Sequence, residues 1–249
     1  MLELEELDRR KYLRQITLPG FGEEAQRKLK NASALVARAG GLGGPVALYL
    51  AAAGIGRLVI LHGGNLTWTN LNRQILQAQD WVGKPRADKI RESILRLNHD
   101  IDLTVVPEDP DDRNLDTWAP TVDILCDCPP TYEERFAMNR ASLRHRKPMV
   151  EAGMSDMEGI LTVFVPGQTA CLECLCPEVP PEWSGSKFPV LGAVSGALGC
   201  LAAIEAIKVL TGFGEPLTGE LLTMDTLRHT YRKLKLPRDP HCRACSGIG

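Results

Sequence analysis

Two pairs of cysteines have the spacing that binds a metal ion. The pairs are Cys171 with Cys174 and Cys242 with Cys245. Each C-x-x-C turn can present two thiolates to one ion, and two such turns complete a tetrahedral four-cysteine zinc site. Because four thiolates leave no open position, we expect a structural zinc that ties the C-terminal end to the body of the protein. The alternative is a set of redox dithiols or incidental cysteines.

A glycine-rich loop is the second candidate site. Residues 37–44 read ARAGGLGG and stand where a first strand passes into a first helix. Backbone N–H groups and the helix N-terminus bind phosphates at such a place in α/β sheets. Arg38 stands at the first glycine of G-x-G-x-x-G, and His62 ends the next strand where an acid would hold a ribose. The loop alone is therefore an imperfect nucleotide-binding motif.

The elements around these residues predict an α/β fold. We expect a Rossmann-like, mostly parallel sheet with helices on both faces, an antiparallel C-terminal extension and the four-cysteine zinc site. The expected parallel strands are 34–37, 58–61, 103–106, 122–125 and 148–150, with helices at 45–53, 86–97 and 131–144. The expected C-terminal elements are a strand at 160–165, a helix at 193–210 and a last strand at 221–224.

Length and composition favour one large domain. The 249 residues are 44% hydrophobic, which suffices for a full core. We divide the chain into an N-terminal helical arm (1–30), a nucleotide-binding-like half (31–153) and a C-terminal half (154–249) with the zinc site and a crossover loop. The proline-rich part of that loop is expected to be mobile or to face a partner.

Charge and hydropathy exclude several classes of protein. The formal net charge of -2 gives no general attraction to nucleic acid or to an anionic membrane. The acidic N-terminus lacks the zones of a signal peptide. The most apolar stretch, near 193–209, is interrupted by Ser195, Glu205 and Lys208, so we expect no membrane span. A cytoplasmic protein is the expectation.

Taken together, these motifs resemble the ThiF/MoeB/HesA proteins, bacterial relatives of the ubiquitin-activating enzymes. The supporting segments are KYLRQ at 11–15, AGGLG at 39–43, TNLNRQ at 69–74, VGKP at 82–85 and both cysteine pairs. The resemblance implies ATP- and magnesium-dependent adenylation of the C-terminal Gly-Gly of a ubiquitin-like sulfur carrier, as in molybdopterin or thiamin synthesis.

Several family positions are retained. The resemblance implies that Gly41 and Gly43 let the backbone of the glycine-rich loop approach the nucleotide. It also implies that Asn70 and Arg73 contact the phosphates. It makes Arg14 the arginine that reaches across a dimer into the neighbour's ATP site, unless Arg14 only anchors its own helix by a salt bridge. Arg86 stands where the family has a phosphate-binding lysine, so the positive charge is retained there.

The departures from the family gather on the chemistry. His62, Gly64 and Pro130 replace carboxylates near the nucleotide, and the one at Pro130 positions magnesium in the family. Gly185 stands where many members carry a cysteine. Losing one preorganised electrostatic group typically slows catalysis about 100- to 1000-fold. We expect the side chain of Arg38 to block the usual nucleotide pose unless it swings outward. The alternative is a solvent-exposed arginine at a strand end that does no harm. Asp127 is a substitute metal ligand only if its loop is rebuilt.

Two functional hypotheses follow. In the first, the protein is impaired or inactive in adenylation and binds a Gly-Gly-ended carrier, or pairs with an active paralogue, as a homodimer or a heterodimer. In the second, it is an active adenylyltransferase with altered ligands. The lost acids thus put ATP and magnesium in question as cofactors, whereas zinc is expected. A third reading is that the cavity binds a different anion.

Overall fold

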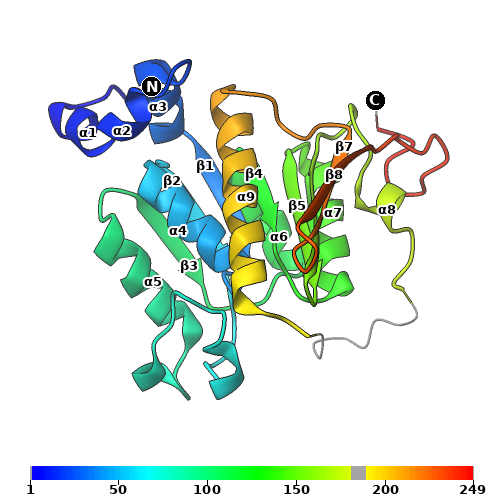
Figure 1. Cartoon of the computed structure of the whole chain (residues 1–249), viewed down its shortest axis with the longest axis horizontal. Helices are drawn as coiled ribbons and strands as arrows, with labels where there is room; N and C mark the ends of the chain where they lie inside the picture. The colour runs from blue at the N-terminus through cyan, green and yellow to red at the C-terminus, as the bar shows by residue number, and fades with distance from the viewer. Residues whose placement is uncertain (1, 181–188, 249) are drawn as a thin grey trace.

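The computed structural model describes residues 2–180 and 189–248 of the chain. Within these residues the strands form one sheet in the order β3-β2-β1-β4-β5-β6-β7-β8 (Figure 1). The strands are β1 (Ser33–Ala37), β2 (Arg57–Leu61), β3 (Asp102–Val106), β4 (Ile124–Asp127), β5 (Met149–Ser155), β6 (Glu158–Phe164), β7 (Glu220–Asp225) and β8 (Thr230–Lys235). Strands β1 to β5 are parallel, whereas β6, β7 and β8 pair antiparallel.

Helices cover both faces of this sheet (Figure 1). On the face nearer the viewer, α4 (Gly43–Ala53), α5 (Arg86–Leu97) and α9 (Gly192–Thr211) pack on the central strands. On the other face lie α6 (Asp112–Trp118) and α7 (Tyr132–His145). The remaining helices are α1 (Glu6–Lys11), α2 (Leu13–Ile16), α3 (Gly22–Lys30) and α8 (Leu172–Leu175), with short 3₁₀ helices at Trp68–Asn70, Gln79–Trp81 and Ala119–Thr121. The predicted fold class is confirmed.

The predicted elements agree closely with the observed ones, but α6, α8 and β8 were not predicted. The helix expected at 86–97 has those bounds, and the other predicted elements shift by a few residues. The strand at 221–224 is not the last, because β8 follows it. Every residue of β8 is exposed or half-buried, so it carries no alternation of apolar and polar side chains. The signal on which a strand prediction depends is absent there.

The long helix α9 belongs to the core. By length and composition it could cross a membrane, but 44% of its most apolar window is buried inside the protein. Its buried side chains include Leu198, Ala202 and Ala206, which pack on the sheet beside α4. Gly199 allows this approach, since a Cβ there would lie 2.3 Å from the carbonyl oxygen of Leu42. Helix α9 therefore packs directly against the glycine-rich loop at Leu42.

Candidate functional site

The four predicted cysteines come together at the C-terminal end of the chain. Their sulfur atoms all lie within 4.8 Å of one another. The Sγ–Sγ distances are 3.9 Å for Cys171 to Cys174, 3.7 Å for Cys171 to Cys242 and 3.5 Å for Cys174 to Cys245. A zinc ion with Zn–S bonds of about 2.3 Å places its four sulfurs roughly 3.8 Å apart. The cluster can therefore hold a metal ion, and its geometry suits tetrahedral thiolate coordination.

A buried asparagine fixes this cluster to the body of the protein. Asn139 of α7 accepts a hydrogen bond from the backbone N–H of Leu172 at 3.1 Å. Its amide group donates to Glu173 at 3.2 Å and lies 3.8 Å from the sulfur of Cys171. Such hydrogen bonds orient the ligands of a metal site. The other cysteines do not join the cluster: Cys126 and Cys128 are buried, while Cys176 and Cys200 are half-buried.

A second site opens beyond the carboxyl ends of the parallel strands, where an α/β sheet binds its ligand. It is a cavity of about 420 Å³, which we call the nucleotide cavity. The structure brings most of the predicted residues to its wall, namely Arg38, Gly41, His62, Asn70, Arg73, Arg86 and Pro130. It adds others that the sequence did not single out, namely Thr69, Gln74, Asp109, Arg135 and Ser195.

Arg38 turns away from the glycine-rich loop. Its backbone is left-handed (φ 64°), a conformation that glycine adopts most easily. Its guanidinium pairs with Glu134 at 2.5 Å and also with Asp109. The side chain is only 15% exposed, so the alternative of a solvent-exposed arginine is wrong. Because the guanidinium is held at the rim by two acids, it leaves the cavity open.

Asp109 and Glu134 are carboxylates that sequence reasoning missed. Asp109 follows β3, and its Oδ1 accepts from the backbone N–H of Gly63 at 3.0 Å as well as from Arg38. Glu134 lies in the first turn of α7 and accepts from the hydroxyl of Thr131 at 2.6 Å. The acidic run at 108–112 at the end of a strand was the available signal for the first. Nothing local connects Glu134 with Arg38, because they are far apart in the chain.

Arg86 fills the space beside Gly64, a position where the sequence resemblance predicts an acid in the family. Its guanidinium donates to the carbonyl oxygens of Gly63 at 2.5 Å and Gly64 at 3.4 Å. A Cβ at Gly64 would lie 2.7 Å from this guanidinium, and the residue has a φ of +78° that disfavours side chains. Gly64 and Arg86 are thus sterically coupled, and a carboxylate at position 64 requires Arg86 to move.

The two predicted loop glycines are required by packing inside the chain. A Cβ at Gly43 would lie 2.3 Å from the carbonyl oxygen of Arg38. A Cβ at Gly41 would lie 2.9 Å from the side chains of Arg73 and Ser195. Gly43 therefore brings the start of α4 against the end of β1, and Gly41 admits Arg73 beside the loop. Their contact with a nucleotide stays a prediction.

His62 is buried and uncharged. It is 2% exposed, and neither ring nitrogen has a hydrogen-bond partner in the structure. Burial, together with the positive charges of Arg86 and Arg38, lowers its pKa to about 3. The side-chain oxygen of Gln74, on the same cavity wall, is also buried without a partner. Unpaired buried polar atoms are costly, so both side chains indicate a polar ligand.

The lowered pKa of His62 predicts a pH-dependent stability. The unfolded histidine takes up a proton below about pH 6.5, whereas the folded one stays neutral down to about pH 3. The free energy of unfolding therefore falls as the pH drops through this window, by up to about 1.4 kcal/mol per pH unit. We expect His62→Gln to flatten this dependence in urea unfolding between pH 7 and pH 5. Parallel curves for the two proteins would contradict the prediction.

Asp127 does not face the cavity as a free metal ligand. It is fully buried at the end of β4, 3.4 Å from Arg135, which also pairs with Glu151 at 2.6 Å. Burial and the neighbouring Glu151 raise the pKa of Asp127 well above its usual value. One oxygen of each carboxyl group lacks a partner, and a proton held on Asp127 would satisfy both. Asp127 therefore serves to hold Arg135.

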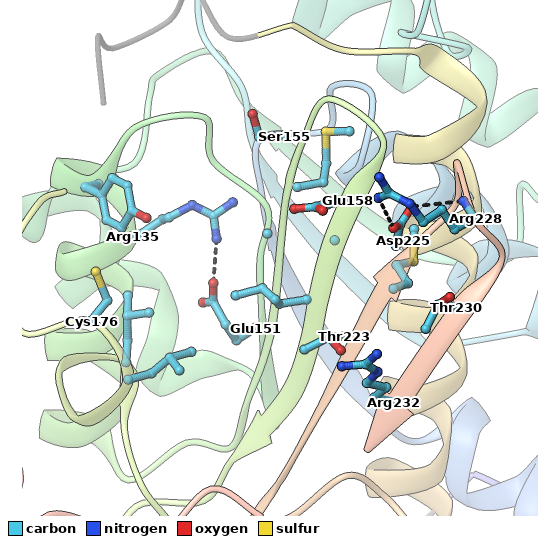
Figure 2. Close-up of a pocket in the computed structure, with 18 residues that line it drawn as sticks. Arg135, Glu151, Ser155, Glu158, Cys176, Thr223, Asp225, Arg228, Thr230 and Arg232 are labelled. Atoms are coloured by element: carbon cyan, nitrogen blue, oxygen red, sulfur yellow. Dashed lines mark hydrogen bonds and ion pairs between the residues drawn. The ribbon is translucent and has the colours of Figure 1, made fainter. Parts of the chain in front are cut away.

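Arg135 joins the nucleotide cavity to a larger one. This second cavity, of about 760 Å³, lies over β5, β6 and β7, and we call it the sheet cavity (Figure 2). Arg135 and Met154 line both cavities. Figure 2 shows Arg135 pointing at Glu151 on one side of the sheet cavity, and Asp225 paired with Arg228 on the other. An extended ligand on these strands can therefore reach the nucleotide cavity.

Arg14 lies apart from both cavities of its own chain. It is exposed on α2, which lies against α3 in the N-terminal arm (Figure 1), and it is not among the residues that line either cavity. Among the described residues it forms no ion pair, so nothing supports the salt-bridge alternative. Gly185 and most of the proline-rich segment lie outside the described residues.

With this geometry established, the family follows. The ThiF family model matches residues 12–244. The chain belongs to the ThiF family. Related ThiF-type proteins match along nearly the whole chain. The HesA protein of Leptolyngbya boryana is 49% identical over 98% of this chain and 88% of its own length. The adenylyltransferase and sulfurtransferase MOCS3-1 of Zea mays is 38% identical over 94% of this chain, which spans about half (51%) of that relative.

Two solved structures share the fold. The crystal structure of E. coli MccB with ATP superposes with a TM-score of 0.79 at 25% identity, over 90% of this chain and 70% of MccB. The structure of SeMet PaaA has a TM-score of 0.77 at 21% identity, over 95% of this chain and 76% of that one, and shows the fold alone. The chain is thus an adenylyltransferase-like ThiF protein whose cysteine cluster can bind a metal ion.

Proposed function

We propose that this ThiF protein binds the Gly-Gly end of a ubiquitin-like sulfur carrier and is impaired in adenylating it. The observation that carries the proposal is the shortage of carboxylates in the nucleotide cavity. Among the described residues, Asp109 is the one carboxylate that lines it, and Arg38 already holds an oxygen of Asp109. Adenylation brings a carboxylate against an α-phosphate, so it depends on charge neutralisation by a held metal ion.

The two cavities suit a carrier tail and a nucleotide. Glycine residues need little width, so a Gly-Gly tail can lie over β5 and β6 and end at Arg135, which is positioned to meet its carboxylate. In the nucleotide cavity, Asn70, Arg73 and Arg86 suit the phosphates. His62 offers the ribose hydroxyls a neutral hydrogen-bonding group in place of a carboxylate. The crystal structure of MccB with ATP, which shares this fold, supports a nucleotide as the ligand.

Two further parts of the proposal concern zinc and assembly. We assign zinc to the cysteine cluster, since its four sulfurs have the spacing of a closed thiolate shell. We also propose a dimer, either of two copies or with an active paralogue, in which Arg14 reaches the partner's cavity. Its exposure, with the exposed apolar side chains of Leu13 and Leu18, supports this arrangement. We propose that the N-terminal arm (1–30) and the two halves (31–153 and 154–249) form a single domain.

Binding of a carrier tests the proposal. The probe is a recombinant ubiquitin-like sulfur carrier that ends in Gly-Gly, and its control is the same carrier without those two residues. Calorimetry is expected to detect the full carrier and to show at least about tenfold weaker binding of the truncated one. Equal affinities, or no binding of either carrier by the protein and its paralogue complex, would contradict the carrier role.

An active adenylyltransferase is the second candidate, and one observation favours it. The second oxygen of Asp109 is not held by Arg38, and the side chain is about half exposed (52%). Asp109 could then replace the lost magnesium ligand. In that case Asp109→Asn, which keeps an acceptor for the Gly63 N–H, would abolish ATP–pyrophosphate exchange that the parent protein carries out.

A further inference from the structure

We propose that the nucleotide cavity binds a nucleoside polyphosphate without a divalent cation, because arginine side chains take the place of magnesium. The inference rests on the proposed nucleotide role of this cavity and specifies the form in which the ligand binds. It concerns binding alone, so it is separable from carrier binding and from adenylation.

The first observation is a pair of guanidinium groups without counter-ions. Arg73 and Arg86 are half-buried on the cavity wall, and among the described residues neither forms an ion pair with a carboxylate. Arg73 donates to the carbonyl oxygen of Thr69 at 2.7 Å and to the side chain of Asn72 at 2.9 Å. Burial lowers the pKa of both groups, and the charge of Arg38 lowers that of Arg86 further. Half-buried cations in this state favour an anionic ligand.

The second observation is that the oxygen donors present do not suit magnesium. Mg²⁺ prefers oxygen ligands and is usually held by one or two carboxylates together with phosphates. Gly64 and Pro130 have no side-chain oxygen, and His62 offers nitrogen. Asp109 has one oxygen held by Arg38, so it offers a metal ion only its second oxygen. A dication beside it would lie next to that guanidinium and within the field of Arg86, whose pKa responds to the charge of Asp109.

The arginines can instead neutralise the phosphates directly. Arg38 and Arg135 on the cavity wall are already paired with carboxylates, whereas among the described residues Arg73 and Arg86 have no carboxylate partner and remain to bind the phosphates. A guanidinium donates two parallel hydrogen bonds to a phosphate, which combines charge with orientation. Because His62 is neutral, no negative charge stands at the ribose position to oppose the ligand. The excess of positive charge therefore matches free ATP better than its magnesium complex.

Calorimetry with ATP as the probe tests this inference. ATP is titrated into the full protein once in EDTA and once in excess Mg²⁺. We expect dissociation constants that agree within about threefold, or tighter binding in EDTA. Binding at least about tenfold tighter in Mg²⁺ would overturn the inference, and so would no binding of ATP under either condition.

Matched arginine variants identify the groups responsible. Arg86→Gln keeps hydrogen bonding at the start of α5 but removes the charge, and we expect ATP binding in EDTA to weaken at least about tenfold. Arg96→Gln, exposed near the end of the same helix, is the control and should bind as the parent protein does. Equal loss in both variants, or none in Arg86→Gln, would overturn the assignment. Thermal unfolding of each variant verifies that it is folded.

Pro130→Asp supplies the reverse test. Restoring a carboxylate to the cavity should make ATP binding at least about tenfold tighter in Mg²⁺ than in EDTA. A magnesium effect equal to that of the parent protein would count against the reasoning on the donor set. ATP binding can be measured whether or not the protein binds a carrier. The inference and the proposed function can therefore fail separately.

Discussion

Replacement of Cys245 by serine is expected to release the bound metal and to destabilise the protein by at least about 3 kcal/mol. Structural zinc contributes folding energy directly, with apparent binding energies of about 10–16 kcal/mol in zinc-finger peptides. Cys245 is buried, and its sulfur lies 3.5 Å from that of Cys174. For a chain of this length, such a loss lowers the unfolding midpoint by roughly 6–12 °C.

The measurement combines metal analysis with thermal unfolding. The parent protein should contain one zinc ion per chain, and chelation should lower its midpoint as Cys245→Ser does. Cys176→Ser is the matched control, because Cys176 lies near the cluster but donates to the carbonyl oxygen of Glu178. A metal-free parent protein, or equal midpoints for the two serine variants, would show that the cluster has no structural ion.

The second large effect concerns adenylation. The sequence resemblance places family acids at the positions of His62, Gly64 and Pro130, and loss of a single preorganised electrostatic group typically slows catalysis about 100- to 1000-fold. The losses share one site and are not additive. We therefore expect ATP–pyrophosphate exchange to be at least about 100-fold slower than in a ThiF-family relative that has these acids.

The fold was predictable because its signals are local. Short apolar strands, the glycine-rich loop and the apolar face of α5 each identify an element within a few residues. Helix α6 was missed although Asp111 caps it by accepting from the backbone N–H of Asn114, a start signal that is visible in the sequence. Strand β8 has no comparable signal, since its side chains are mostly exposed and it is held by pairing with β7.

The two candidate sites also differ in how far they could be predicted from local sequence. The cysteine cluster was predictable because each pair fixes its own spacing. The position of the Arg38 side chain was not, because its partners Asp109 and Glu134 come from the end of β3 and the start of α7. Likewise, the space filled by Arg86 beside Gly64 depends on the start of α5 lying against the loop after β2, where the backbone N–H of Arg86 donates to the carbonyl oxygen of Gly64. Such pairings depend on the folded chain and have no signature along the sequence.

The most direct test of the central claim is ATP–pyrophosphate exchange in the presence of Mg²⁺ and a Gly-Gly-ended carrier. The parent protein and the double variant His62→Asp with Pro130→Asp are compared at equal concentration. Impaired adenylation by lost carboxylates predicts little or no exchange by the parent and at least about a tenfold increase in the variant. The claim would be contradicted if the parent protein exchanges pyrophosphate at the rate of an acid-containing relative and the double variant is no faster.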